Sequence, residues 1–307
     1  MKLFIAGVLI LLSINSYAQQ SQAADNINQW KKAVVKIESI QQRYNFAQVD
    51  AMLHKQTDSV KGLSQHEKYN TQGELLTISD TIRGTGFLVS DGNKVYLVTA
   101  KHLIKATENA ANNTEIINDL ITIKTNTGNK VSNDISLMNL SENKVSLQPF
   151  VFSSNKEDIG IISFQKASHR TILTYMKQEG CVPIPIQSIN TADEDNTGDK
   201  VSTMGFPALP GPGQDDPVVS NGTITSYVKT SASFNVDLNV YPGNTGGPVI
   251  ENNKLIGILS FQSGISTNID AAMHPYQKAA SATAIKISSI LPLLKELQEH
   301  ERTAGYK

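Results

Sequence analysis

The sequence predicts an all-β fold, either a barrel or a sandwich. From residue 75 to residue 261, short runs rich in β-branched and aromatic residues recur, and Gly, Asn and Asp residues separate them. Asp91-Gly92 lies between two apolar runs, which is the pattern of a tight hairpin. Short strands at this spacing, with turn residues between them, are typical of barrels and sandwiches.

The bulk composition suits a globular protein with a sizeable core. The chain has 307 residues, of which 39% are hydrophobic and 18% are charged, so one large or two small domains are expected. The formal net charge is −1. This balance gives no indication of nucleic acid or an anionic membrane surface as a partner.

Residues 1–18 have the pattern of a secretory signal peptide. Lys2 is followed by an almost wholly apolar run, Leu3 to Ile14, and then by the small-x-small site Ser16-Tyr17-Ala18. We expect cleavage near Ala18-Gln19, a periplasmic or secreted protein, and no stable membrane anchor after the signal is removed. An uncleaved anchor is the alternative, but the run is shorter than the roughly 20 residues that span a bilayer.

Cysteine and histidine usage predicts neither a disulfide nor a metal site. Cys181 is the single cysteine, and its segment Gly180-Cys181-Val182-Pro183 predicts a small buried side chain rather than a nucleophile. Five histidines show no metal-ligand spacing and are expected at the surface or in the core: His54, His66, His169, His274 and His300. We expect no cofactor and no metal.

The first part of the chain should begin with a short helix around Trp30 that leads into a strand at 33–40. Residues 41–72 are polar and form a predicted insertion, to which we assign no function. Further strands are predicted at 75–78, 87–90, 94–99, 120–125, 131–137, 145–152 and 159–164.

The second part repeats this pattern and ends in a helix. Strands are predicted at 182–189, 201–204, 218–228, 234–240 and 249–261, the last of them turned at Asn252-Asn253. The Pro- and Gly-rich residues 207–217 predict an irregular loop. Residues 281–299 carry apolar side chains at helical spacing, which predicts a terminal amphipathic helix.

The segment Tyr241-Pro242-Gly243-Asn244-Thr245-Gly246-Gly247-Pro248 lies between two apolar runs. Its glycines permit backbone conformations that a Cβ would forbid. Successive N–H groups in such a loop can hold an anionic oxygen, and Thr245 places a hydroxyl at the centre.

Two further residues supply the groups that acyl transfer requires. His102 follows the predicted strand at 94–99, and Asp158 directly precedes the one at 159–164. An imidazole can take a hydroxyl proton, a carboxylate can fix its tautomer, and backbone N–H groups can stabilise an oxyanion. Glu157 is an alternative to Asp158, and the glycine-rich segment could be a purely structural turn.

Several segments in this order resemble the trypsin-like, or chymotrypsin-like, serine proteases, in particular the bacterial secreted HtrA and glutamyl-endopeptidase branch. Besides the glycine-rich segment, they are Thr99-Ala100-Lys101-His102, Asp158-Ile159-Gly160-Ile161, Gly198-Asp199-Lys200-Val201, Met204-Gly205-Phe206-Pro207 and Val219-Ser220-Asn221-Gly222-Thr223-Ile224.

The resemblance covers about Lys32 to Leu294 and implies two six-stranded antiparallel β-barrels followed by a C-terminal helix. The implied peptidase domain spans 25–299, with barrel 1 at about 30–165, barrel 2 at about 181–278 and the helix at 281–299. We expect no PDZ domain after it.

By the same resemblance, His102 is the general base, Asp158 orients it, and Thr245 takes the nucleophile position, where the usual bacterial segment G-N-S-G-G-P has Ser. The N–H groups of Gly243 and Thr245, with Asn244 between them, form the oxyanion hole. Members of the family that are activated by clipping carry Asp at the position of Asn244. We therefore expect this loop to form without zymogen cleavage.

The resemblance also places the substrate pocket, along two segments without acidic residues. They contribute Asn239, Tyr241, Ser260, Phe261 and Gln262. A preference for Lys or Arg is therefore unsupported.

Two functions remain open at this point. The first is an exported endopeptidase that hydrolyses peptide bonds in peptides or proteins through an acyl-enzyme. The second is a catalytically silent pseudoprotease that binds a peptide or a protein partner. The added methyl of Thr245 separates them, because overpacking by one methyl costs about 1–3 kcal/mol, or roughly 5- to 150-fold in rate.

Overall fold

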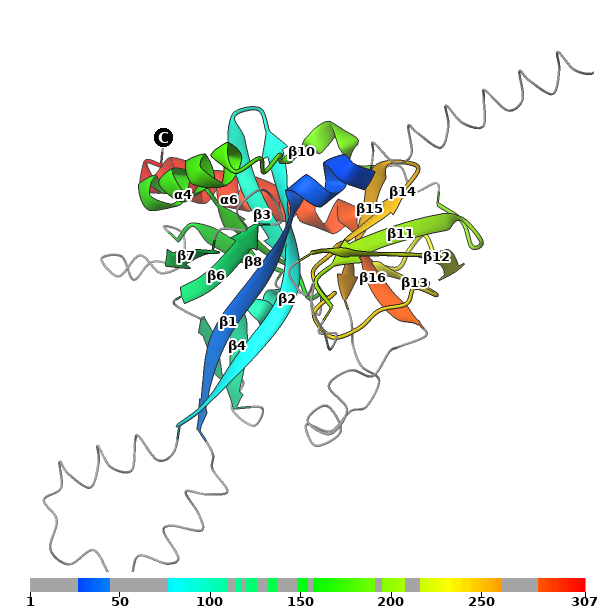
Figure 1. The fold of residues 1–307 in the computed structure, drawn as a ribbon, viewed down its shortest axis with the longest axis horizontal. Coiled ribbons are helices and arrows are strands. Elements are labelled where there is room, and N and C mark those ends of the chain that lie inside the picture. The colour runs from blue at the N-terminus through cyan, green and yellow to red at the C-terminus, as the bar shows by residue number, and fades with distance from the viewer. Residues whose placement is uncertain are drawn as a thin grey trace, which may run out of the picture.

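The computed structural model describes residues 27–44, 77–109, 114–117, 120–125, 132–136, 148–153, 157–190, 195–207, 216–260 and 281–306. The predicted signal peptide, residues 45–72 of the predicted insertion, and the pocket residues Phe261 and Gln262 lie outside them. Two β halves lie side by side, with the first half on the left in Figure 1 and the second on the right. The all-β two-barrel fold class predicted from the sequence is confirmed.

The first half is an open half-barrel. Its sheet has the order β7-β6-β1-β2-β3-β9-β8, with β10 pairing in parallel to β2, and β4 and β5 form a separate hairpin. The strands are β1 (Val34–Tyr44), β2 (Thr77–Asp91), β3 (Lys94–Thr99), β4 (Lys105–Asn109), β5 (Thr114–Ile117), β6 (Leu120–Thr125), β7 (Ser132–Ser136), β8 (Phe150–Phe152), β9 (Gly160–Ser163) and β10 (Ile184–Pro185). Among the described residues, this half is an open sheet, whereas the expected fold has a closed six-stranded barrel here.

The second half is a closed six-stranded barrel. Its order is β11-β12-β13-β16-β15-β14, and every described neighbour pair is antiparallel. The strands are β11 (Lys200–Gly205), β12 (Val218–Ser226), β13 (Ser233–Val236), β14 (Pro248–Glu251), β15 (Lys254–Ser260) and β16 (Ala282–Lys286). Closure removes free sheet edges, which protects the barrel from pairing with other chains.

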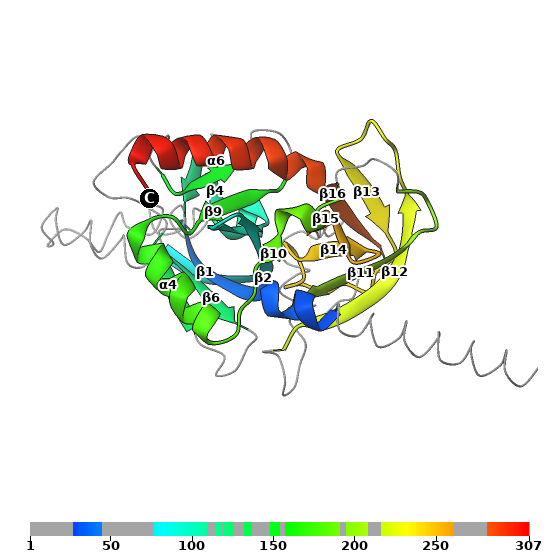
Figure 2. The same cartoon turned by 90° about the horizontal axis from the view of Figure 1, so that it is seen from above.

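Helices cover the outside of the two halves. They are a helix at 27–33, the α-helices α4 (Ala167–Gln178) and α6 (Ile290–Ala304), and the short 3-10 turns η1 (Lys101–Leu103), η3 (Ile186–Ser188) and η4 (Ile287–Ser289). In Figure 2, α6 runs from the end of β16 back along the first half. None of the helices in the described ranges is long and apolar enough to cross a membrane.

One side chain of α6 anchors this helix to the first half. Glu301 is 1% exposed, accepts a hydrogen bond from Ser163 Oγ at 2.6 Å, and pairs with Lys94 Nζ at 2.6 Å. The carboxylate is therefore buried with both a charge partner and a hydroxyl donor, which is the condition for keeping a buried charge without a large penalty.

Three apolar clusters make up the core. One fills the first half and one fills the closed barrel. The third joins the halves, because Phe87 and Val98 of the first half share it with Met204 and Ile258 of the second. The two halves are thus packed as one body, and the glycine-rich loop of the second half can meet the strand ends of the first.

The predicted terminal helix begins too early. Residues 282–286 form β16, which pairs with both β13 and β15, and the α-helix starts only at Ile290. Apolar residues at this spacing are compatible with a helix or with a strand. Residues 282–286 form a strand because they pair with two strands that are distant in sequence. Helix α6 ends at Ala304, because the next residue, Gly305, has a left-handed φ of 69° that stops the helix.

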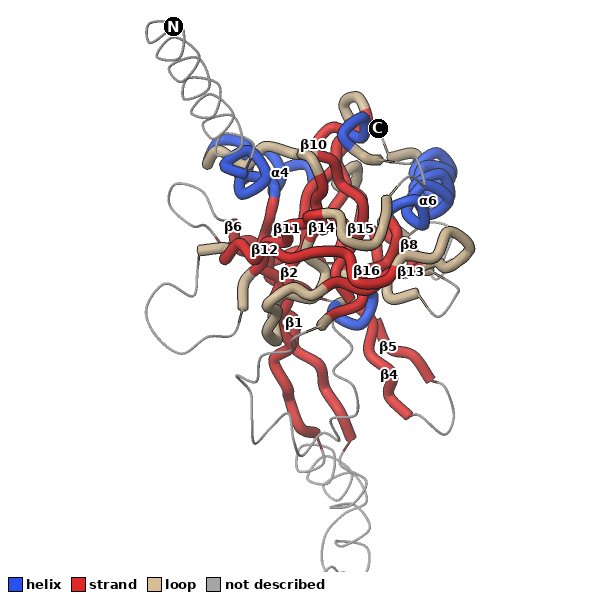
Figure 3. The backbone as a smooth tube through the Cα atoms, turned by 90° about the vertical axis from the view of Figure 1, so that its right-hand side faces the viewer, coloured by secondary structure: helices blue, strands red, loops and turns tan. Residues whose placement is uncertain are grey.

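The predicted limits of the second barrel, 181–278, are wrong at both ends. Residues 184–185 pair with β2 of the first half, and the barrel strands run from Lys200 to Lys286. The predicted insertion also begins too early, because residues 41–44 continue β1 opposite 77–80. Figure 3 shows this β1–β2 ribbon projecting from the body of the protein.

Glu251, the last residue of β14, has its carboxyl group close to those of Asp195 and Asp199. Partial burial and the two nearby carboxyl groups raise its pKa to about 7. The folded protein then keeps a proton that the unfolded chain releases near the ordinary value of 4.5. The resulting stability is present below that value and is lost as the pH rises towards 7.

We therefore expect the melting temperature to fall between about pH 5 and pH 7. Glu251→Gln should flatten this decline, because the amide does not ionise. Glu299→Gln on the exposed face of α6 is the control, and it should leave the decline unchanged. Thermal unfolding followed by circular dichroism tests this, and an unchanged slope in Glu251→Gln contradicts it.

Candidate active site

His102 and Asp158 meet at one end of the adjacent strands β3 and β9. In the antiparallel pair β3–β9, Thr99 lies opposite Gly160. His102 lies three residues beyond Thr99, in η1, and Asp158 lies two residues before Gly160. The antiparallel register therefore brings both residues to the same end of the two strands.

Two hydrogen bonds join these residues. His102 Nδ1 lies 2.6 Å from Asp158 Oδ2, and the His102 backbone N–H donates to Asp158 Oδ1 at 2.9 Å. Burial alone would raise the pKa of the Asp158 carboxyl, but the hydrogen bonds from His102 and the favourable electrostatics of His102 and Lys101 lower it overall. An ionised Asp158 assigns the proton of the neutral ring to Nδ1 and leaves Nε2 as a proton acceptor.

The alternative acid, Glu157, has a different partner. Its carboxylate accepts a hydrogen bond from Ser153 Oγ at 3.3 Å. The acid that contacts the imidazole is therefore Asp158, as the position at the strand entry predicts.

The loop at 241–248 begins with a tight turn. The Asn244 N–H donates to the Tyr241 carbonyl at 3.0 Å, with Pro242 and Gly243 between them. Gly243 has a φ of 97°, so this turn has proline and glycine at the positions that a type II turn favours. A side chain at Gly243 would make this turn costly.

The carbonyl groups of this loop are held one after another. The Gly243 carbonyl accepts from Thr85 Oγ1 at 2.7 Å, the Asn244 carbonyl from the Gly247 N–H at 3.0 Å, and the Thr245 carbonyl from the Thr85 N–H at 2.8 Å. Within the described residues, no hydrogen bond uses the N–H of Gly243 or of Thr245. Because the C=O and N–H of a peptide unit point in opposite directions, the Thr245 N–H points away from the bonded Asn244 carbonyl.

The loop lies directly against the strand that leads to His102. Gly246 has a φ of 86°, and a Cβ there would overlap the Thr85 carbonyl oxygen and lie 2.9 Å from the Ala100 nitrogen. The backbone next to Thr245 is thus in close contact with the end of β3. Thr245 is 5% exposed, and its hydroxyl makes no hydrogen bond to the His102 ring among the described residues.

Sequence reasoning missed the role of Thr85. It lies in β2 within Gly84-Thr85-Gly86, it is fully buried, and its backbone and hydroxyl hold two carbonyls of the loop. A polar residue between two glycines, directly before the apolar run at 87–89, is the signal that could have found it.

The predicted pocket residues have mixed positions. Asn239 is exposed, Tyr241 is partly exposed, and Ser260 is buried in β15 opposite Thr283. Asn239 also receives a hydrogen bond from Ser220 Oγ to its carbonyl at 2.7 Å. Phe261 and Gln262 lie outside the described residues, so the described part of the pocket is its Asn239 to Tyr241 side.

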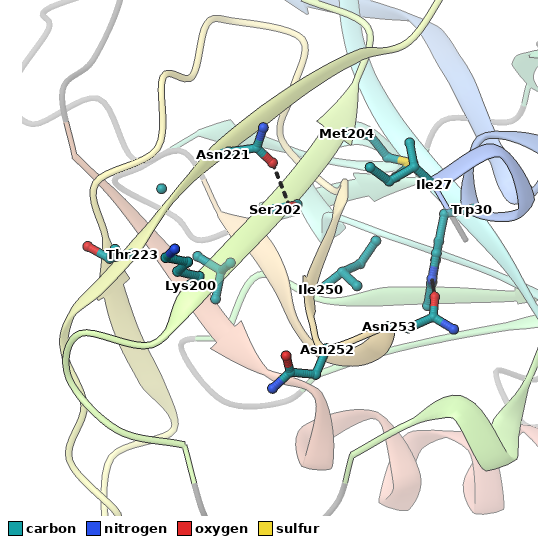
Figure 4. Close-up of a pocket in the computed structure, with 12 residues that line it drawn as sticks. Ile27, Trp30, Lys200, Ser202, Met204, Asn221, Thr223, Ile250, Asn252 and Asn253 are labelled. Carbon is teal, nitrogen blue, oxygen red and sulfur yellow. Dashed lines mark hydrogen bonds between the residues drawn. The ribbon is translucent and has the colours of Figure 1, made fainter. Parts of the chain in front are cut away.

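A cavity of about 730 Å³ lies elsewhere, between the helix at 27–33 and the outer face of the closed barrel (Figure 4). Trp30 forms one wall and donates from Nε1 to Asn253 Oδ1 at 2.9 Å, while Ser202 donates to Asn221 Oδ1 at 2.7 Å. None of the predicted catalytic residues lines this cavity. It is therefore separate from the candidate active site.

Cys181 has the buried position that the sequence predicts. It is 3% exposed, its thiol donates to the Lys32 carbonyl at 3.0 Å, and burial raises its pKa to about 12. A protonated, buried thiol is a poor nucleophile. Among the described residues, no group of three or more His, Cys, Asp or Glu side chains is arranged to hold a metal ion.

The protein has two β halves. A His–Asp pair lies at one end of the strands of the first half, and a glycine-rich loop of the second half packs against that end. This arrangement is that of the trypsin-like peptidases. The model of the trypsin-like peptidase domain matches residues 84–258, more than half of the chain, and the chain belongs to this family.

One solved structure of an HtrA-type protease shows the same fold. An alanine variant of the HtrA-type protease AlgW with a decapeptide matches with a TM-score of 0.50 and 16% identity, over 90% of this chain and 67% of that chain. AlgW with a decapeptide matches with a TM-score of 0.49 and 14% identity, over the same shares. A comparison with curated protein sequences found no match.

Proposed function

We propose that this protein is an exported endopeptidase whose triad is His102, Asp158 and Thr245. The observation that carries the proposal is the pair of unused N–H groups, Gly243 and Thr245, in a loop packed against the strand that leads to His102. In acyl transfer, two backbone N–H groups that point at the same carbonyl oxygen stabilise the developing oxyanion.

In the proposed mechanism, His102 Nε2 takes the proton of the Thr245 hydroxyl as the oxygen attacks the scissile carbonyl. Asp158 holds Nδ1 and so keeps the ring in the required tautomer. The negative charge that develops on the carbonyl oxygen is held by the N–H groups of Gly243 and Thr245. His102 then protonates the leaving amine, and water releases the acyl group from Thr245 by the same steps in reverse.

The decapeptide in the similar HtrA-type structure supports a peptide or protein substrate. The predicted signal peptide supports export to the periplasm or the medium. N-terminal sequencing of the protein from that compartment tests the export, and a mature chain that does not begin near Gln19 contradicts the cleavage site.

A pseudoprotease that binds peptides is the second candidate. It is favoured by the 5% exposure of Thr245 and by the missing hydrogen bond between its hydroxyl and His102. Catalytic hydrogen bonds often tighten only when substrate binds, so this geometry does not exclude the peptidase. The two candidates differ in whether Thr245 becomes acylated.

Thr245→Ser should raise peptidase activity roughly 5- to 150-fold, because it removes a methyl that costs about 1–3 kcal/mol if it crowds the transition state. The measurement is labelling by a fluorophosphonate probe, read by intact mass, beside turnover of a peptide library. His102→Ala in the same background should abolish both signals.

Each outcome separates the candidates. A probe adduct on wild-type Thr245 that requires His102 supports the peptidase. No adduct on the wild type but a strong one on Thr245→Ser supports a scaffold silenced by one methyl, and therefore the binding function. No adduct and no turnover in Thr245→Ser overturns the peptidase proposal.

A further inference from the structure

We infer that Thr85 is the positioning residue of the oxyanion hole, and that its side-chain hydroxyl keeps the 243–245 backbone in the conformation that leaves two N–H groups free. This inference rests on the proposed function, and it assigns a task to a residue of β2 that lies far from the loop in sequence. Thr85 touches no reacting atom. Its effect passes through the loop backbone.

Thr85 makes hydrogen bonds to the loop on both sides of Asn244. Its hydroxyl donates to the Gly243 carbonyl at 2.7 Å, and its N–H donates to the Thr245 carbonyl at 2.8 Å. Both bonds lie in a fully buried environment, where an amide or hydroxyl bond is worth more than in water. A glycine has little conformational preference of its own, so these bonds from Thr85 help to select the backbone conformation at Gly243.

The hydroxyl bond acts on one particular peptide plane. The unit between Gly243 and Asn244 is held at both ends, by Thr85 Oγ1 on its carbonyl and by the Tyr241 carbonyl on its N–H. With this plane held, the peptide unit before it cannot turn freely. The Gly243 N–H of that unit is one of the two proposed oxyanion donors.

The same hydroxyl is itself fixed by the protein. The Phe206 N–H, just after β11, donates to Thr85 Oγ1 at 3.0 Å, so the hydroxyl proton is directed to the Gly243 carbonyl. On the other side, Thr99 Oγ1 donates to the Thr85 carbonyl at 2.7 Å. Thr85 is thus bonded to the strand end before His102, to the loop that carries Thr245, and to the start of the second barrel.

The residue before the nucleophile position cannot hold the loop through an ion pair. Asn244 is 1% exposed, and its side-chain oxygen has no hydrogen-bond partner among the described residues. A neutral amide tolerates this position better than a buried carboxylate would. At Gly243 and Asn244, the loop is therefore held by the Thr85 hydroxyl and by the Asn244–Tyr241 backbone hydrogen bond, and not by an ion pair of residue 244.

The experiment compares Thr85→Val, which removes the hydroxyl at nearly constant shape, with Thr85→Ser, which keeps it. Both are made in the Thr245→Ser background. We expect Thr85→Val to lower kcat by about 10- to 100-fold with KM within about twofold, since a misaligned donor acts on the transition state. Thr85→Ser should stay within about threefold of the parent.

Thr203→Val is the matched control. Thr203 is equally buried, and its hydroxyl donates to the carbonyl of Pro248, the last residue of the loop, at 2.9 Å. It reports the loss of one buried hydroxyl without the Gly243 contact. Its kcat should stay within about threefold of the parent, while its midpoint of chemical unfolding falls as much as that of Thr85→Val.

Full kcat in Thr85→Val, or an equal loss in Thr203→Val, overturns the inference. If the Thr245→Ser parent itself is inactive, the proposed function fails, and amide hydrogen exchange decides about Thr85 separately. In that case, residues 241–248 should exchange faster in Thr85→Val than in Thr85→Ser. Equal exchange in the two variants also overturns the inference.

Discussion

Asp158→Asn is expected to lower kcat by about 10³- to 10⁴-fold. The reason lies in the two contacts of this carboxylate. The amide oxygen of Asn would accept the His102 backbone N–H in place of Oδ1, and its NH₂ group would then face His102 Nδ1. The ring must then carry its proton on Nε2, where the mechanism needs an acceptor.

Steady-state kinetics in the Thr245→Ser background measures this loss, with KM expected to change little. Glu157→Gln is the control, because the carboxylate of Glu157 contacts Ser153 instead of His102. Activity in Asp158→Asn within tenfold of the parent would show that another group orients the imidazole.

Gly246→Ala is expected to abolish activity and to lower the free energy of unfolding by about 2–5 kcal/mol. A left-handed backbone costs an L-residue roughly 1–2 kcal/mol, and overpacking adds about 1–3 kcal/mol. The new Cβ would overlap the Thr85 carbonyl oxygen and crowd Thr99 Oγ1 at 2.6 Å, and both belong to the hydrogen bonds behind the loop. The loop must therefore move away from the end of β3.

Chemical denaturation and probe labelling measure the two effects together. Gly198→Ala is the control for backbone strain, because Gly198 has a similar φ of 99° but open space where its Cβ would lie. It should cost only about 1–2 kcal/mol and keep activity. Equal destabilisation in the two variants would mean that the contact with Thr85 is unimportant.

The prediction from sequence was best where the signal is local. Residues 94–99 form β3 with the predicted bounds, because an apolar run there is closed by a turn on one side and the His102 segment on the other. The turn at Asn252-Asn253 is present as well, with φ values of 45° and 65°. Asparagine tolerates this conformation, so the turn can be predicted from the two residues alone.

The prediction failed where a distant partner decides. Helix α4 was not predicted, although Ile172, Leu173 and Met176 have helical spacing. The sequence pattern predicts a helix at the residues that form β16, because the identity of this strand depends on its pairing with both β13 and β15. Periodicity reports which face is apolar, and it does not report which neighbour is there to cover it.

The sequence by itself determined the family resemblance, the two-part β architecture and the residue types of the candidate site. These follow from patterns within a few residues of His102, Asp158 and Thr245. Only the tertiary structure showed that Asp158 rather than Glu157 contacts the imidazole, and that Thr85 holds the carbonyls of a loop 158 residues away. The physical reason is that hydrogen bonds of this kind depend on the packing of the two halves against each other, and no local pattern in the chain records that packing.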